Sequence, residues 1–244
     1  MIGLTTCLAG NGSTFFTGTS KTGIPGAGIL GVVLLANTME HTRQSVGVLL
    51  PLLIAADIFA VCYYRRHADW KLILRVLPWT LAGLGVGYVT LTFAEGQDFS
   101  LLLGGLVLAI LALDLLRNRL GWTRIPHHPM YTVFLGIATG FATTIGNVAG
   151  PVMSLYLLSL GLDKHKFMGS MAWFFLIVNT LKVPLFISAD MITVDSLKLS
   201  IWFLPGIVLG ALVGRQLFKR IPTKPFAVAV QVLAAAAAIR LMWM

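Results

Sequence analysis

Long apolar stretches alternate with short polar ones along most of this chain. Residues 45–64 form an apolar run of about 20 residues, which is the length that an α-helix needs to cross a bilayer core. Five further stretches have the same character, at residues 72–93, 99–116, 167–187, 197–218 and 226–242. The pattern therefore predicts six membrane-spanning helices.

Two other apolar regions, residues 2–38 and 130–162, are interrupted by glycine, proline and hydroxyl side chains. The interruptions read TGTSKTGIPGAGILG at residues 17–31 and TGFATTIGNVAGP at residues 139–151. Glycine and proline cost roughly 1 and 3 kcal/mol in a helix interior, so both stretches predict helix breaks. Each region is too short for two full crossings and a turn, so we expect a hairpin of two short arms that starts and ends on one side.

The two halves of the chain resemble each other. At an offset of 122 residues, Thr17-Gly18 matches Thr139-Gly140, Gly47 matches Gly169, and Asp57 matches Asn179. At an offset of 127 residues, Leu77-Pro78, Gly83 and Gly87 match Leu204-Pro205, Gly210 and Gly214. The glycines of this second set recur every four residues, a spacing typical of close helix contacts in membranes.

These matches predict two structural repeats, residues 1–116 and 130–244, joined by a polar linker at 117–129. Each repeat is one broken hairpin followed by three crossings. Because three is odd, the second repeat must lie upside down relative to the first, as in many transporters. Paired breaks in the two halves are also the best sequence indication of a transport site.

Composition places the whole chain in the membrane. It is 57% hydrophobic and only 11% charged, whereas soluble domains are about 25% charged. The net charge of +9 does not indicate nucleic-acid binding here, because the basic residues gather in short loops. The fold class is therefore an all-α polytopic membrane protein in the lipid bilayer.

Loop charge predicts the orientation. Twelve of the 18 Lys and Arg residues lie in loops 65–71, 117–129, 162–166 and 215–224. Of the Lys and Arg residues, loops 39–44, 94–98 and 188–196 contain only Arg43, and they also contain several acidic residues. The positive-inside rule makes the first set cytoplasmic and puts both termini outside.

Three ionisable residues fall deep within apolar segments: Lys21, Asp57 and Lys182. Charges at such depth are costly and mark functional sites. We expect Lys21 to bind an anion directly, with Gly23 allowing close backbone approach. The other candidate substrate-binding residues supply neutral donors or a second ammonium: Thr22, Thr143, Thr144, Asn147, Asn179 and Lys182.

Asp57 is the deep carboxylate, and we expect it to exchange a proton during the cycle. The alternative is a buried Asp57–Lys182 ion pair that only fixes helix packing. The sequence contains no hydrolase, metalloprotease or nucleotide-binding motif in a suitable context. We therefore expect no enzymatic activity, no cofactor and no metal site.

Four segments carry a resemblance to a known family. They read SKTGIPGAG (20–28), SVGVLLPLLIAADIFAVCYYRRHADW (45–70), TGFATTIGNVAGPVMSLYLL (139–158) and WFFLIVNTLKVPLF (173–186). The chain resembles the TauE/SafE family of sulfite exporters and related anion permeases, although Thr22 stands where many members have glycine. The resemblance implies transport of sulfite, sulfonates or similar anions across the bacterial inner membrane, coupled to protons.

The sequence thus predicts a secondary transporter for a small sulfur-containing anion, with protons as partners. Two alternatives stay open, a permease for another small organic anion and a membrane assembly protein without transport. A homo-oligomer also stays open.

Overall fold

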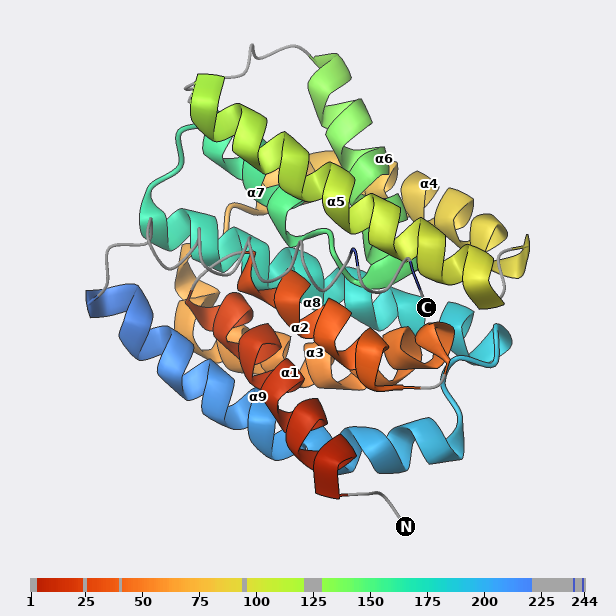
Figure 1. Ribbon diagram of the computed structural model, residues 1–244. Helices are drawn as coiled ribbons and strands as arrows, with labels where there is room; N and C mark the ends of the chain where they lie inside the picture. The colour runs from red at the N-terminus through yellow and green to blue at the C-terminus, as the bar shows by residue number, and fades with distance from the viewer. Residues whose placement is uncertain are drawn as a thin grey trace.

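The computed structural model describes residues 4–23, 26–39, 41–93, 96–120 and 129–220, together with residues 239 and 243. The described part of the chain is helical, with short turns and no strand (Figure 1). Its α-helices are α1 (Leu4–Thr22), α2 (Ala27–Thr38), α3 (Thr42–Tyr64), α4 (Trp70–Phe93), α5 (Gly96–Leu120), α6 (Pro129–Gly146), α7 (Gly150–Ser159), α8 (Lys164–Ser188) and α9 (Val194–Arg220). A 3₁₀ helix, η1 (Arg65–His67), continues α3.

Four helices of the described part are long and apolar enough to cross a membrane. They run over Thr42–His67, Trp70–Phe93, Lys164–Ser188 and Val194–Leu217. The predicted crossing at 99–116 is helix α5, whose apolar stretch, Asp98–Ala112, is shorter. The predicted crossing at 226–242 lies outside the described residues, apart from residue 239. The chain is a multi-pass membrane protein.

Both predicted breaks exist, but each is shorter than the sequence suggests. Helix α1 continues through Lys21 to Thr22, and α2 begins at Ala27. In the second region α6 continues to Gly146, and α7 begins at Gly150. Hydroxyl side chains explain the longer helices, because the Thr17, Thr19 and Thr22 hydroxyls donate to carbonyls one turn back and so need no other backbone conformation.

The first arm of each hairpin packs against a long helix of the other half. Figure 1 shows α1 beside α9, and α6 beside α4. Gly18 of α1 lies against the Ile207 carbonyl, and Gly140 of α6 lies against the Thr80 carbonyl. Ile207 and Thr80 are 127 residues apart, which is the second offset found in the sequence. The same correspondence holds for Gly210 on Phe15 and Gly83 on Ile137, and for Gly214 on Thr22 and Gly87 on Thr144.

Helices α3 and α8 cross at the centre. Their matched residues touch each other, since Asn179 Nδ2 donates to Asp57 Oδ2 at 2.7 Å. A residue that contacts its own equivalent lies close to a two-fold axis. These contacts are the ones that a two-fold repeat would make, while the opposed orientation of the halves in a bilayer stays a prediction.

The glycine contacts give a first testable prediction. A β-carbon at Gly83 would meet the Ile137 backbone, whereas at Gly85, on an exposed face of the same helix, it would meet nothing within 4 Å. We expect Gly83→Ala to lower stability by about 1–3 kcal/mol, because two backbones must separate. Gly85→Ala should be neutral or slightly stabilising, since alanine favours a helix. Thermal unfolding in detergent would show this, and equal midpoints for the two variants would contradict the close α4–α6 contact.

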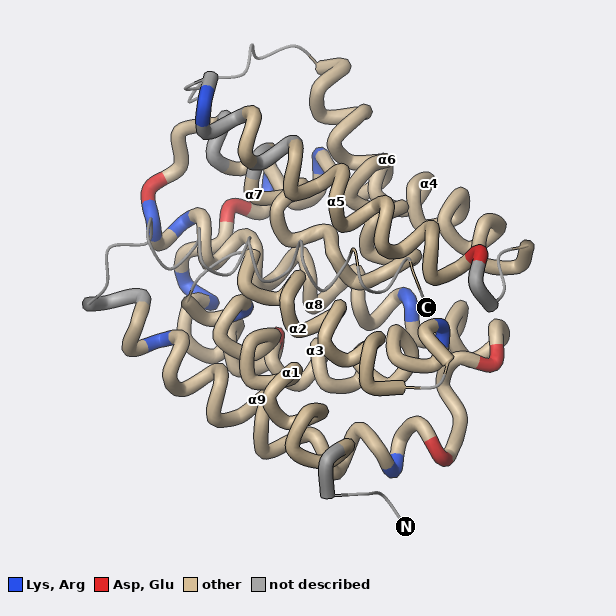
Figure 2. Tube along the Cα trace, in the orientation of Figure 1, with Lys and Arg blue, Asp and Glu red and all other residues tan. Residues whose placement is uncertain are grey.

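Basic and acidic residues separate along the molecule. Figure 2 shows most Lys and Arg at the end where α8 begins and α9 ends, and several acidic residues at the opposite end. At the basic end, Asp163 caps α8 by accepting from the backbone N–H groups of Lys166 and His165. These hydrogen bonds hold the pKa of Asp163 below its ordinary value. The large apolar side chains exposed on α4 and α9, such as Val86, Val89, Ile201 and Trp202, suit a surface that faces lipid.

Candidate functional site

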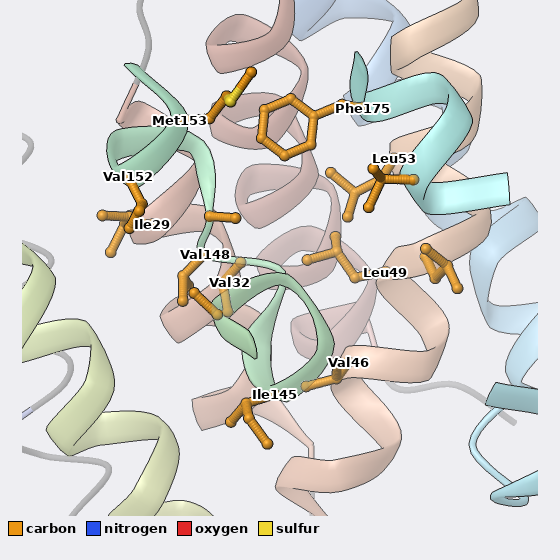
Figure 3. Close-up of a cluster of buried hydrophobic side chains, with 14 of the residues drawn as sticks. Ile29, Val32, Val46, Leu49, Leu53, Ile145, Val148, Val152, Met153 and Phe175 are labelled. Atoms are coloured by element: carbon orange, nitrogen blue, oxygen red, sulfur yellow. The ribbon is translucent and has the colours of Figure 1, made fainter. Parts of the chain in front are cut away.

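A small cavity lies where the two hairpin breaks approach α3 and α8. Its volume is about 40 Å³, which is room for roughly three water molecules at 10–15 Å³ each. Its apolar wall includes Ile29, Val32, Leu53, Val148 and Phe175, and Figure 3 shows these side chains gathered around the second break. Its polar lining consists of Thr17, Ser20, Lys21, Asp57, Thr143, Asn147 and Asn179. A cavity of this size suits an ion of a few atoms.

Two helix N-termini reach the cavity. Gly26 and Gly28 line it at the start of α2, and Gly150 and Pro151 line it at the start of α7. The first N–H groups of a helix have no partner within the helix, and they carry a partial positive charge. A β-carbon at Gly26 or Gly150 would meet nothing within 4 Å. Both breaks therefore bring backbone N–H groups with a partial positive charge to the same cavity.

Lys21 and Asp57 form an ion pair in this cavity. Lys21 Nζ lies 2.8 Å from Asp57 Oδ1, and the side chains are 15% and 0% exposed. The ammonium also lies 4.1 Å from the centre of the Phe175 ring, within the range of a cation–π interaction. The sequence offers Lys21 no acidic neighbour, but folding brings Asp57 from α3 to it.

Lys182 does not pair with Asp57, so the alternative ion pair predicted from the sequence is wrong. Its Nζ donates to the carbonyl oxygen of Thr143 at 2.7 Å and to the hydroxyl at 3.1 Å. It also donates to Asn147 Oδ1 and, at 3.4 Å, to Asn179 Oδ1. Lys182 is fully buried, and these partners are all neutral oxygens. Asp57 pairs with Lys21 and not with Lys182, because the Asn179 amide lies between the carboxylate and Lys182.

One polar chain therefore connects the two halves. It runs from Lys21 through Asp57 and Asn179 to Lys182, and from there to Thr143 and Asn147. Lys21 and Thr143 are themselves 122 residues apart. The structure thus brings six of the nine residues expected at the site into one hydrogen-bonded network.

Lys182 belongs to this network but does not line the cavity, and the other three expected residues do not line it either. Thr22 donates to the Ala211 carbonyl at 2.7 Å, and Gly23 lies against the Gly214 backbone, so both pack α1 on α9. Thr144 donates to the Gly140 carbonyl at 2.8 Å and packs on Gly87. Neighbouring residues on a helix point about 100° apart. Residue type alone does not show which of two neighbours faces the site, so the sequence could not exclude these three residues.

The amide groups at the site also point differently from expectation. Asn147 Nδ2 donates to the Val46 carbonyl at 3.1 Å, and Asn179 Nδ2 donates to Asp57. Their oxygens both face Lys182. These two residues therefore hold the two charged groups in place.

Phe175 and the methionines Met168 and Met171 also line the cavity, although they are not among the residues expected there from the sequence. Helical spacing could have found Met168 and Phe175, because residues 168, 172, 175, 179 and 182 are separated by alternating steps of four and three. Such a series lies on one helix face. The face that carries Asn179 and Lys182 is the face that Phe175 shares.

One comparison with known proteins gives a match, and it covers nearly the whole chain. The family model described as "Sulfite exporter TauE/SafE" matches residues 12–241. Neither the curated proteins nor the solved structures contain a match to the chain.

Proposed function

Because the chain belongs to the TauE/SafE family of sulfite exporters, an anion transporter family, we propose that it is a secondary transporter that moves sulfite, a sulfonate or a similar small sulfur oxyanion across the bacterial inner membrane. The observation that carries the proposal is the Lys21 ammonium beside two helix N-termini in one small cavity. An ammonium and free N–H groups together favour an oxyanion.

Asp57 gives the transporter a way to couple the anion to a proton. Its carboxylate occupies the position on Lys21 that a substrate oxyanion would take. Protonation removes the negative charge of Asp57 and frees Lys21 for the anion. Anion and proton then bind together, because two anions on one lysine repel each other.

The repeat supplies a route for alternating access. The first arm of each hairpin packs on the long helix of the other half through glycines, and the cavity lies between the two breaks. In transporters with inverted repeats, one repeat rocks against the other around a central site. We propose that α1–α9 and α6–α4 are the surfaces along which this motion occurs.

The inverted arrangement makes a prediction about labelling. In a variant with Cys7 and Cys62 replaced, single cysteines at Arg66 and Lys166 should react only with a reagent on the cytoplasmic side. Cysteines at His41 and Asp190 should react only from outside, because these exposed positions lie at opposite ends of α3 and α8. Labelling of His41→Cys and Lys166→Cys from the same side would rule out the opposed repeats.

Uptake into proteoliposomes tests the function itself. Labelled sulfite, a small sulfonate, a carboxylate and chloride should be compared with and without an imposed pH gradient. We expect saturable, gradient-driven movement of the sulfur anions. Preference for the carboxylate would favour a permease for other organic anions, and no movement of any anion would favour an assembly protein.

A further inference from the structure

The surroundings of Lys182 are those of a cation-binding site. Four oxygen atoms from three residues lie around its Nζ: the carbonyl and hydroxyl of Thr143, Asn147 Oδ1 and Asn179 Oδ1. An ammonium has only three protons to donate. These four oxygen atoms, called the oxygen shell below, therefore include one more acceptor than the ammonium has protons.

The second hairpin break builds this shell. Thr143 lies in the last turn of α6, where the helix dipole is negative and favours a cation. Asn147 follows the end of α6 with a φ of 57°, in the left-handed region that asparagine tolerates better than most residues. This turn carries Asn147 Oδ1 back towards Lys182. The break thus exposes oxygens on one side and the N–H groups of α7 on the other.

Both amide oxygens are fixed before any cation binds. The Asn147 amide nitrogen is held by the Val46 carbonyl, and the Asn179 amide nitrogen is held by Asp57. Each side chain can therefore turn only its oxygen towards Lys182. The Phe186 ring, whose centre lies 5.0 Å from Nζ, adds a further surface that favours a positive charge.

The charge balance selects a monovalent ion. The shell itself contains no carboxylate, and Asp57 reaches it only through Asn179. Divalent cations such as Mg²⁺ and Ca²⁺ in proteins are bound with carboxylates. Uncharged carbonyl oxygens at broken membrane helices instead bind Na⁺ or K⁺.

We propose that the second hairpin break is a monovalent-cation site that the Lys182 ammonium fills permanently. The wild-type protein therefore needs no sodium at this break. A variant with a shorter side chain at position 182 binds sodium there instead. The proposal concerns cation binding, and it holds whether or not the chain transports sulfite.

The test is the thermal stability of Lys182→Ala in detergent, in sodium chloride and in choline chloride of equal ionic strength. We expect sodium to raise the midpoint of the variant by about 3–6 °C at tenfold excess over Kd, and further with the logarithm of the sodium concentration. The wild type should show no such rise. Lys198→Ala, which removes an exposed lysine, is the matched control and should behave like the wild type.

A second substitution identifies the oxygens. Adding Thr143→Val to Lys182→Ala removes one of the four oxygens and should weaken the apparent sodium affinity at least tenfold. Lys182→Ser leaves similar space and serves if the alanine variant is not recovered. An equal sodium effect in the wild type, no sodium effect in either Lys182 variant, or failure to recover both even with sodium present would overturn the proposal.

Discussion

Replacing Lys21 by alanine is expected to weaken anion binding by tenfold to hundredfold. A hydrogen bond to a charged group contributes about 1.5–3 kcal/mol, and 1.4 kcal/mol corresponds to a factor of ten in affinity. Lys21 is the ammonium that lines the described cavity, since Lys182 is turned towards neutral oxygens. Sulfite affinity should be measured by equilibrium binding to the purified protein.

The ion pair requires a careful control, because Lys21→Ala leaves the buried Asp57 carboxylate without its cation. Breaking one partner of a buried pair is strongly destabilising. The double variant Lys21→Ala with Asp57→Asn removes both charges and should recover stability without recovering anion affinity. Lys21→Arg should restore binding only in part, because the planar guanidinium has a different reach. Affinity in the double variant within twofold of that of Asp57→Asn alone would remove Lys21 from the site.

The second large effect is expected for Asp57→Asn, which should abolish accumulation of the anion driven by a pH gradient. Asparagine resembles the protonated carboxyl group and does not compete with the anion for Lys21. The variant should therefore bind the anion at least as well as the wild type, and exchange it across the membrane without accumulation. Counterflow and gradient-driven uptake in the same proteoliposomes separate these two activities.

Asp195→Asn is a matched comparison, because Asp195 is an exposed carboxylate that pairs with Lys198 and does not line the cavity. The substitution removes one acidic group and leaves the Lys21–Asp57 pair in place. Gradient-driven uptake should survive in this variant if proton coupling depends on Asp57. Accumulation at the wild-type rate in Asp57→Asn would show that another group carries the proton.

Much of the fold was accessible from the sequence because membrane insertion restricts the choices. Apolar length alone predicted α3, α4, α8 and α9. Glycine spacing predicted close helix contacts on α4 and α9, but it did not predict their partners, which are α6 and α1. The extent of the breaks was not predicted. Propensity treats Thr17 to Thr22 as poor helix, whereas in an apolar environment their hydroxyl groups bond to the helix itself.

The sequence predicted which charged residues come together, but it did not predict which of them form an ion pair. Depth in an apolar segment selected Lys21, Asp57 and Lys182, since a buried charge is costly wherever it lies. Which charges pair depends on the approach of α1 to α3 and on the position of Asn179, and no local pattern encodes either. Thr22 and Thr144 illustrate the same limit, because their residue type suits an anion site while their helix face is turned to α9 and α4.

In the proposed mechanism an anion displaces Asp57 from Lys21, and a proton accompanies the anion. Calorimetry of sulfite binding in two buffers with different ionisation enthalpies measures this directly, because it counts the protons taken up with the anion. Comparison of the wild type with Asp57→Asn removes the contribution of sulfite itself. We expect the wild type to take up about one proton more per anion than the variant. An equal number of protons for the two proteins would show that Asp57 does not take up the proton.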